Sequence, residues 1–289
     1  MREVYYTYGG DEYILAMVSE EMSSEANLKV HTICRLIREE NITGVTEVCP
    51  VNASFLVRYK PELINPDILI NKLKETEKKV QYVDSFSSKL VEIPVLYNDP
   101  WSIECAREFS NHHQDPSMTN IEFVARINGL SVEDLIKRHS ATQFIVSTIF
   151  FMPGGALYYQ MVDEKEAILC PKYKKPRGWT PIRTLVHGGC FTGIMTHRSP
   201  GGYQLIGSSA VPIFEPEGIL IDLKNKLLVE SGDRVKFRSV EIDEYNEIRK
   251  KAEEGTYRYK ISDQEFKTSE YQRDPNGYLK SLERDLPHA

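Results

Sequence analysis

Residues 170–207 read CPKYKKPRGWTPIRTLVHGGCFTGIMTHRSPGGYQLIG, and this stretch decides the fold class. Its prolines lack the backbone donor that a helix interior needs, and its glycines allow tight turns and close approaches of the backbone. The pattern therefore predicts short strands at 183–187, 193–196 and 203–206, joined by turns. Turn amides beside fixed cations are suited to holding an anion or an oxyanion. The alternative is that the glycines only turn corners in a β-barrel.

The sequence on both sides of this stretch extends the strand pattern. Further strands are expected at 91–96, 144–151 and 234–240, with a hairpin of 218–223 and 226–229 turned at 224–225, and helices at 99–110, 120–128, 131–139 and 245–254. Many short strands with closely spaced turns favour a barrel.

The first 80 residues show a different order of elements. Tyr-, Val- and Ile-rich segments at 3–8 and 12–18 predict a hairpin, and a second strand pair is expected at 46–50 and 53–59. A helix follows each pair: one over about 23–40, begun by capping serines, and one that starts at Asn65-Pro66-Asp67. This ββαββα order predicts a two-layer domain with its helices on one face of an antiparallel sheet.

The fold class expected from these elements is therefore α+β, with a small two-layer α/β domain followed by a β-barrel domain. The polar segment 84–88 (DSFSS) is interpreted as a linker, which puts the domain boundary near residue 89. We expect an N-terminal α/β domain at 1–89, a barrel domain at 90–240, and a C-terminal helix with an extended tail at 241–289.

Composition restricts the classes of function. The formal net charge of −6 argues against a nucleic-acid partner, because neutralising phosphates requires a basic face. No stretch approaches the roughly 20 apolar residues that span a bilayer, and the first ten residues contain no apolar signal core. Five scattered cysteines without CxxC spacing argue against a disulfide framework or a structural zinc site. We expect a cytoplasmic protein with neither a nucleic-acid nor a membrane partner.

One cluster of metal-binding residue types occurs at His112, His113 and Asp115. Adjacent histidines on a strand or helix point in different directions, and Asp115 is the only further ligand nearby. A polar loop is therefore the preferred interpretation, and no metal site is expected.

Several motifs together resemble one family of proteins. They are Gly9-Gly10-Asp11, LVEIPVLY at 90–97, LSVEDLIKRHS at 130–140, Pro153-Gly154, Pro176-Arg177 and SPGGYQLIG at 199–207. The sequence is similar over residues 1 to about 270 to the family of allophanate hydrolase subunit 1 and the 5-oxoprolinase B subunit. That family also includes a sporulation-kinase inhibitor and part of the carboxyltransferase region of urea carboxylase. The segments 120–130 and 172–181 most resemble urea carboxylase and related biotin-dependent carboxyltransferases.

The resemblance implies a fold and a set of partners. The implied fold is a small α/β domain followed by a cyclophilin-like β-barrel. A second cyclophilin-like subunit, of the allophanate hydrolase subunit 2 type, would share the reaction site. Biotin carboxylase and a biotin carrier protein are further implied partners: the carrier would present carboxybiotin, a partner would use ATP, and no cofactor would bind this chain directly.

Some positions depart from the family pattern. A common Gly-Gly-Gln-Thr-Gly run appears here as Gly189-Cys190-Phe191-Thr192-Gly193, and a common Pro-Arg pair appears as Pro171-Lys172. These changes weaken a 5-oxoprolinase interpretation and leave the acceptor undetermined.

Transfer of a carboxyl group to an amide nitrogen requires donors for a carboxylate and a route for a proton. Lys172 and Arg177 are the candidates for the carboxylate, and Arg177 suits bidentate contact. His187 is the candidate for proton handling, with a packed strand histidine as the alternative. The candidate substrate-binding residues are Gly188, Gly189, Pro200, Gly201, Gly202, Gln204 and Asn120, although Gln204 as a strand residue could face solvent and Asn120 could cap a helix. Cys190 is not expected to act as a nucleophile, because no base partner is evident.

The functional hypothesis is a subunit of a heteromeric biotin-dependent carboxyltransferase acting on urea or a similar small amide. Two alternatives remain: a subunit of a 5-oxoprolinase or allophanate-hydrolase-type complex, and a non-catalytic binding protein like the kinase inhibitor. The sequence does not decide whether the chain is an enzyme on its own.

Overall fold

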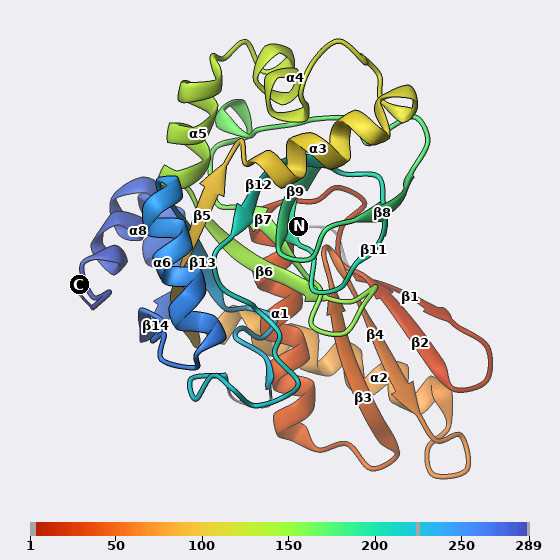
Figure 1. Cartoon of the computed structure of the whole chain (residues 1–289). Helices are drawn as coiled ribbons and strands as arrows, with labels where there is room; N and C mark the ends of the chain where they lie inside the picture. Colours follow the sequence, from red (N-terminus) through yellow and green to blue (C-terminus); the bar gives the residue numbers. More distant parts are fainter. Residues whose placement is uncertain (1–3, 224–225, 288–289) are drawn as a thin grey trace. The chain divides into compact units, whose positions relative to one another are not determined.

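A computed structural model describes residues 4–223 and 226–287 of the chain (Figure 1). The chain divides into two compact units. The smaller unit comprises residues 1–88 and 265–274, and the larger comprises 89–264 and 275–289.

The smaller unit is a two-layer arrangement of a sheet and helices. Its elements are β1 (Tyr5–Tyr8), β2 (Tyr13–Met17), α1 (Ser24–Glu40), β3 (Val45–Val51), β4 (Ser54–Tyr59), α2 (Pro66–Lys79), the 3-10 turn η1 (Val80–Tyr82) and, from the C-terminal part of the chain, α7 (Thr268–Arg273). The antiparallel sheet has the order β1-β2-β4-β3. Its buried side chains alternate along the strands and pack against α1, so the predicted ββαββα order is confirmed.

The larger unit contains the strands of the predicted barrel. Its elements are β5 (Ser85–Tyr97, beginning in the smaller unit), α3 (Pro100–Glu108), η2 (Ser110–His112), α4 (Asn120–Ile127), α5 (Val132–Ala141), β6 (Gln143–Ile149), β7 (Ala156–Gln160), η3 (Glu164–Glu166), β8 (Arg177–Thr180), β9 (Thr184–Gly188), β10 (Phe191–Ile194), β11 (Ser199–Gly201), β12 (Gln204–Ser209), β13 (Arg234–Ser239), α6 (Ile242–Glu253), β14 (Ile261–Lys267, ending in the smaller unit) and α8 (Pro275–Glu283). Strands β9, β10 and β12 are the three that residues 170–207 predict.

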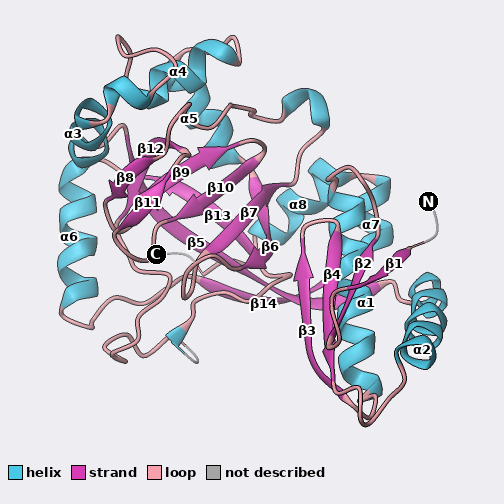
Figure 2. Cartoon of the chain, turned by 90° about the vertical axis from the view of Figure 1, so that its right-hand side faces the viewer, coloured by secondary structure: helices cyan, strands magenta, loops and turns pink. Residues whose placement is uncertain are grey.

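Seven of these strands close into a barrel (Figure 2). The order is β12-β9-β10-β7-β6-β13-β5, and β12 also pairs with β5, which completes the ring. Strands β13 and β5 are parallel, whereas the other neighbouring strands of the ring are antiparallel. Strand β14 adds to β5, and the short pair β8 and β11 forms a separate ribbon. Closure leaves no unpaired edge among the seven strands.

Three helices pack on the barrel and limit where a site can form. Helices α3 and α4 lie against β12, and α5 lies against β13. Each starts at a side-chain cap: Asp99, Thr119 and Ser131 accept a hydrogen bond from a backbone N–H of the first turn. Thr119 and Glu122 complete a capping box.

Two predictions about connecting segments are wrong. Residues 85–88, interpreted as a linker, form the start of β5, where Phe86 and Ser88 are buried. The hairpin expected at 218–229 does not form as two strands: Phe214 and Leu227 make an isolated bridge, and residues 224–225 lie outside the described part of the chain.

The C-terminal segment also differs from the expected extended tail. It contains α6, β14, α7 and α8. Two side chains of α8, Tyr278 and Leu279, are buried, and Gln143 donates a hydrogen bond to the Leu279 carbonyl. The tail is therefore part of the packed structure. Over the described residues, no helix has the length and apolar character needed to cross a membrane.

Candidate functional site

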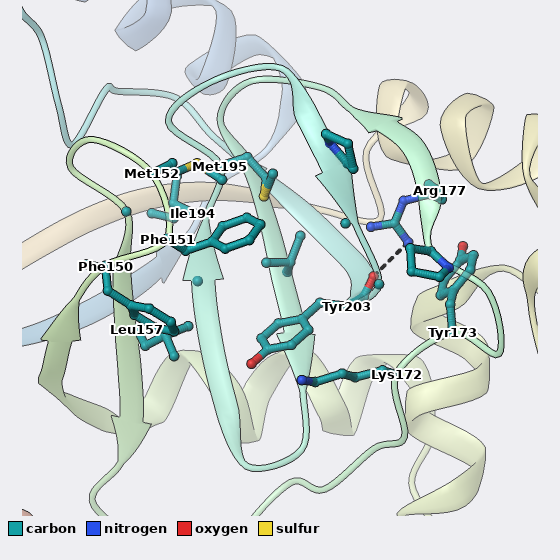
Figure 3. Close-up of a pocket in the computed structure, with 18 residues that line it drawn as sticks. Phe150, Phe151, Met152, Leu157, Lys172, Tyr173, Arg177, Ile194, Met195 and Tyr203 are labelled. Atoms are coloured by element: carbon teal, nitrogen blue, oxygen red, sulfur yellow. Dashed lines mark hydrogen bonds between the residues drawn. The ribbon is translucent and has the colours of Figure 1, made fainter. Parts of the chain in front are cut away.

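A cavity of about 550 Å³ lies in the larger unit, beside the β6–β7 hairpin and the segment before β8 (Figure 3). One side is apolar and includes Phe150, Phe151, Met152, Leu157, Ile194 and Met195. The other side carries two cations, Lys172 and Arg177, with Tyr173 and Tyr203 beside them. Pro200, Gly201 and Gly202 also line the cavity. Of the ten candidate residues, five therefore meet at one site: Lys172, Arg177, Pro200, Gly201 and Gly202.

Arg177 is the most constrained polar group of the site. Its side chain is only 1% exposed, and its guanidinium donates to the Tyr203 carbonyl (2.8 Å) and to the Thr180 hydroxyl (3.2 and 3.3 Å). Both acceptors are neutral, and the ion pairs between described residues include none with Arg177. Burial lowers the pKa of Arg177 below its ordinary value, yet a guanidinium stays charged at neutral pH. The site thus contains a buried positive charge without a carboxylate partner.

Aromatic packing holds this guanidinium in place. The Arg177 Cζ lies 4.4 Å from the centre of the Tyr173 ring. The Tyr173 hydroxyl donates to Asn120 Oδ1 (2.7 Å), which also accepts from the Leu205 N–H (2.9 Å). Asn120 is buried and does not line the cavity, and it supports Tyr173 through the hydrogen bond to its hydroxyl.

Lys172 reaches the same cavity from the exposed side. Its Nζ lies 5.1 Å from the centre of the Tyr203 ring, a cation–π distance. A Cβ atom on Gly188 would lie 2.5 Å from a carbon of that ring, so only glycine allows Tyr203 to pack so close to β9. Gly188 therefore shapes the wall of the cavity without lining it.

Gly201 packs closely against Arg177 and Thr180. A Cβ atom at Gly201 would lie 3.0 Å from the Thr180 hydroxyl and 3.3 Å from Arg177 Nη2. This position pairs directly with Arg177 across β11 and β8. A side chain here would crowd the Thr180 hydroxyl and the guanidinium, so glycine allows this close packing.

Two other residues predicted to bind substrate, Gly189 and Gln204, form hydrogen bonds within the protein instead. The Gly189 amide donates to the Cys170 carbonyl (2.7 Å). The Gln204 amide accepts from His113 Nε2 (2.9 Å) and donates to the Pro171 carbonyl (2.9 Å), and its side chain is fully buried. Neither group lines the cavity, and both hold residues 170–171 in position.

The sequence as a whole matches a known family. Residues 5–219 match the family described as carboxyltransferase domain, subdomain C and D. The chain belongs to this family. Among curated relatives, urea amidolyase of Saccharomyces cerevisiae is 22% identical over 277 residues, which are 94% of this chain and 15% of that protein. The B subunit of 5-oxoprolinase from Bacillus subtilis is 27% identical over 247 residues, 82% of this chain and 93% of that protein.

A solved structure shares the fold. The urea carboxylase of Kluyveromyces lactis matches with a TM-score of 0.81 and 22% identity, over 96% of this chain and 25% of that chain. This likeness shows that the two share a fold with a closed β-barrel and a smaller α/β part. The chain spans about 15% of the length of the S. cerevisiae urea amidolyase and 25% of the K. lactis structure, so their complete activities need not reside in it.

His187, the candidate for proton handling, lies elsewhere in this carboxyltransferase domain. It is fully buried on β9 and does not line the cavity. His187 Nε2 lies 2.9 Å from the Ile168 carbonyl, so this nitrogen carries a proton, and Nδ1 accepts from the Thr192 hydroxyl (2.9 Å). Thr192 in turn accepts from His139 Nε2 (3.0 Å), and His139 Nδ1 accepts from the Tyr97 hydroxyl (2.8 Å). This buried chain of hydrogen bonds requires both imidazoles to be neutral.

The buried hydrogen bonds of His187 and His139 predict that the protein loses stability as the pH falls. Burial lowers the pKa of His187 to about 4 and that of His139 well below its ordinary value. Because the unfolded chain binds protons at these groups below about pH 6.5, the stabilisation is complete above that pH and is lost as the pH falls toward 4. For His187 the expected loss is about 3 kcal/mol. Urea unfolding, followed by fluorescence between pH 7.5 and 4, measures it.

A matched pair of variants separates this effect from the titration of carboxylates. His187→Gln keeps a donor and an acceptor but does not titrate, so its stability should depend less on pH. His197→Gln alters an exposed histidine and should retain the wild-type profile. Equal pH dependence in all three proteins would contradict the assignment.

The sequence interpretation missed the aromatic and apolar side of the site. Tyr173 and Tyr203 stand within the same motifs as the two cations, and Phe150-Phe151-Met152 directly precedes the Pro153-Gly154 turn. Two consecutive aromatics at a turn were an available signal. As for metals, no group of three His, Cys, Asp or Glu side chains in the described part of the chain is arranged to hold an ion.

Proposed function

We propose that this chain is the carboxyltransferase part of a heteromeric biotin-dependent assembly that carboxylates urea or a similar small amide. The observation that carries this proposal is the buried, uncompensated Arg177 guanidinium in a cavity that also contains Lys172. A buried cation without a carboxylate partner is costly unless an anion binds there. A carboxyl group under transfer is such an anion.

The chain's own residues would have distinct roles. Arg177 would orient a carboxylate by paired N–H donors, and Lys172 would add a second positive charge from the exposed side. Gly201 and Gly202 would let the ligand approach the backbone, and the apolar wall would exclude water and strengthen these interactions. Nothing in this arrangement assigns the proton transfer to His187, which is left out of the proposed site.

The remaining components would come from partners. Carboxybiotin on a carrier protein would supply the activated carboxyl group, and the Arg177 and Lys172 donor set fits a carboxylate. A second cyclophilin-like subunit, together with biotin carboxylase and the carrier, would complete the assembly, with ATP used by a partner. The proposal places the assembly in the cytoplasm. It agrees with the small share of urea amidolyase that this chain spans.

One observation favours a second candidate, a 5-oxoprolinase-type complex. The alignment with the B. subtilis 5-oxoprolinase B subunit extends over 93% of that protein. In that case the chain would still work with a second subunit, and biotin would not take part.

A reconstitution experiment separates the two. The tagged chain is purified with its partners from the source organism and supplied with ATP, labelled bicarbonate and either urea or 5-oxoproline. The first proposal predicts urea-dependent fixation of label that avidin abolishes. Avidin-resistant ATP hydrolysis that depends on 5-oxoproline would favour the second candidate instead. If the complete assembly shows neither activity, with 3-phenylpropanamide as well as urea offered as acceptor, both candidates are rejected.

A further inference from the structure

The cavity joins two environments that suit different parts of one ligand. Phe151 is 76% exposed and Phe150 is 48% exposed, and both line the cavity next to Leu157. Exposed aromatic surface of this kind is stabilised when an apolar ligand covers it. This apolar wall therefore favours a ligand with an apolar group, which urea does not have.

The hairpin that carries these rings has a defined shape. The Phe150 N–H bonds to the Gly155 carbonyl (2.9 Å), and the Gly155 N–H bonds to the Met152 carbonyl (2.9 Å). Phe151 has a φ of 74°, in the left-handed region that bulky residues rarely adopt. Backbone strain of this kind concentrates at ligand sites, where the surrounding structure holds it. The two rings are thus presented by a constrained turn.

The opposite end of the cavity, where Arg177 lies, favours a negatively charged group. Arg177 is buried without a carboxylate partner among the ion pairs of the described residues, and it lines the cavity beside Gly201. A neutral apolar ligand would leave this charge uncompensated, and a small anion alone would leave the aromatic wall exposed. Only a ligand with both parts satisfies both ends.

The volume points to the same conclusion. At about 550 Å³ the cavity falls within the range of about 300–1,000 Å³ that is usual for sites of larger organic ligands. Urea has one carbon, one oxygen and two nitrogens, so it would fill only a small part of this space. The cavity is therefore larger than the minimal acceptor requires.

We propose that this cavity binds a carboxylate bearing an apolar ring or chain, with the carboxylate at Arg177 and Lys172 and the apolar body against Phe151 and Met195. As a statement about the reaction, this rests on the proposed function: the ligand with both parts would be the carboxylated amide product, whose acceptor carries an apolar substituent that urea lacks. As a statement about binding, it concerns this chain alone.

Calorimetric titration of the full chain tests the binding. The probes are 3-phenylpropionate, its neutral analogue 3-phenylpropanamide, acetate, urea and biotinamide. We expect saturable binding of 3-phenylpropionate. 3-Phenylpropanamide, which lacks the charge, acetate, which lacks the ring, and urea, which lacks both, should each bind at least about tenfold more weakly. Binding of urea or acetate as tight as that of phenylpropionate would overturn the proposal.

Matched variants locate the site. Lys172→Ala should weaken the binding of phenylpropionate. Lys175→Ala changes an exposed cation of the same segment that does not line the cavity, so it should leave this binding unchanged. Phe151→Asn introduces a residue that tolerates positive φ, and it should also weaken the binding of phenylpropionate. Its control, Ile221→Asn, changes an exposed apolar residue outside the cavity and should leave this binding unchanged. Equal affinity in all four variants would place the ligand elsewhere.

Two results distinguish this inference from the proposed function. Biotinamide that binds tightly and competes with phenylpropionate would assign the apolar wall to the cofactor ring and overturn the inference about the acceptor. Phenylpropionate binding with the expected variant effects, in a chain whose complete assembly transfers no carboxyl group, would reject the proposed reaction while the binding inference stands.

Discussion

The Arg177→Lys variant is expected to lose at least about 100-fold in the rate of carboxyl transfer by the reconstituted assembly. Lysine retains the charge but not the planar pair of donors that meets a carboxylate in bidentate fashion. It also cannot reach the Tyr203 carbonyl and the Thr180 hydroxyl at once, as the guanidinium does. Initial rates at saturating ATP and bicarbonate, with acceptor concentration varied, measure the loss.

The control for this variant is Arg198→Lys. Arg198 stacks on the Trp179 ring, with Cζ 4.2 Å from its centre, much as Arg177 stacks on Tyr173, but it does not line the cavity. We expect Arg198→Lys to retain the wild-type rate. Because Arg177 is buried, circular dichroism and thermal unfolding must show that the Arg177→Lys variant is folded. A folded Arg177→Lys variant with wild-type rate would remove this residue from the site.

A second variant keeps the prediction testable if Arg177→Lys fails to fold. Lys172→Ala removes an exposed side chain and should leave folding intact. Its rate should fall by about tenfold, less than for Arg177→Lys, because Lys172 remains in contact with water and its charge is screened more strongly.

The barrel could be predicted because its signals are local. Prolines and glycines in 170–207 mark the ends of β9, β10 and β12, and each of these strands forms close to its expected position. The ββαββα order of the smaller unit is local in the same way. By contrast, the separation into domains at 1–89, 90–240 and 241–289 stays a prediction about which parts fold independently.

Segments stabilised by distant partners could not be predicted. Residues 85–88 are polar, but Asp84 next to them accepts hydrogen bonds from Thr268 and Ser269, some 180 positions along the chain. Composition reports neither this pairing nor the addition of β14 to β5. The charged tail was expected to be extended for the same reason.

Prediction of the site was limited mainly because the sequence does not show toward which face of the sheet a strand residue points. His187 on β9 is directed into the hydrogen-bonded chain with Thr192, whereas Val186 beside it lines the cavity. A strand alternates its faces with period two, and the sequence does not say which face is which. The apolar wall was missed because Leu157 and Ile194 come to the same cavity as the two cations only through the pairing of β7 with β10, which are distant in sequence.

The second large effect expected concerns stability: Phe237→Ala should lower the free energy of unfolding of the larger unit by about 3–5 kcal/mol. Phe237 is fully buried on β13, and its ring centre lies 5.1–5.6 Å from those of His139, Phe144 and Tyr158. Its removal leaves a cavity among rings that are fixed by closure of the barrel, so little collapse can compensate.

Fluorescence is a suitable probe for this prediction, because both tryptophans of the chain, Trp101 and Trp179, belong to the larger unit. The matched control is Ile182→Ala, at an apolar side chain that is 56% exposed, where a change within about 0.5 kcal/mol is expected. A Phe237→Ala protein that unfolds at the wild-type urea concentration, with unchanged slope, would mean that the aromatic cluster does not stabilise the barrel. Since His139 stacks on Phe237, the same substitution should also raise the pKa of His139 by admitting water, and thereby shift the acid unfolding of the larger unit.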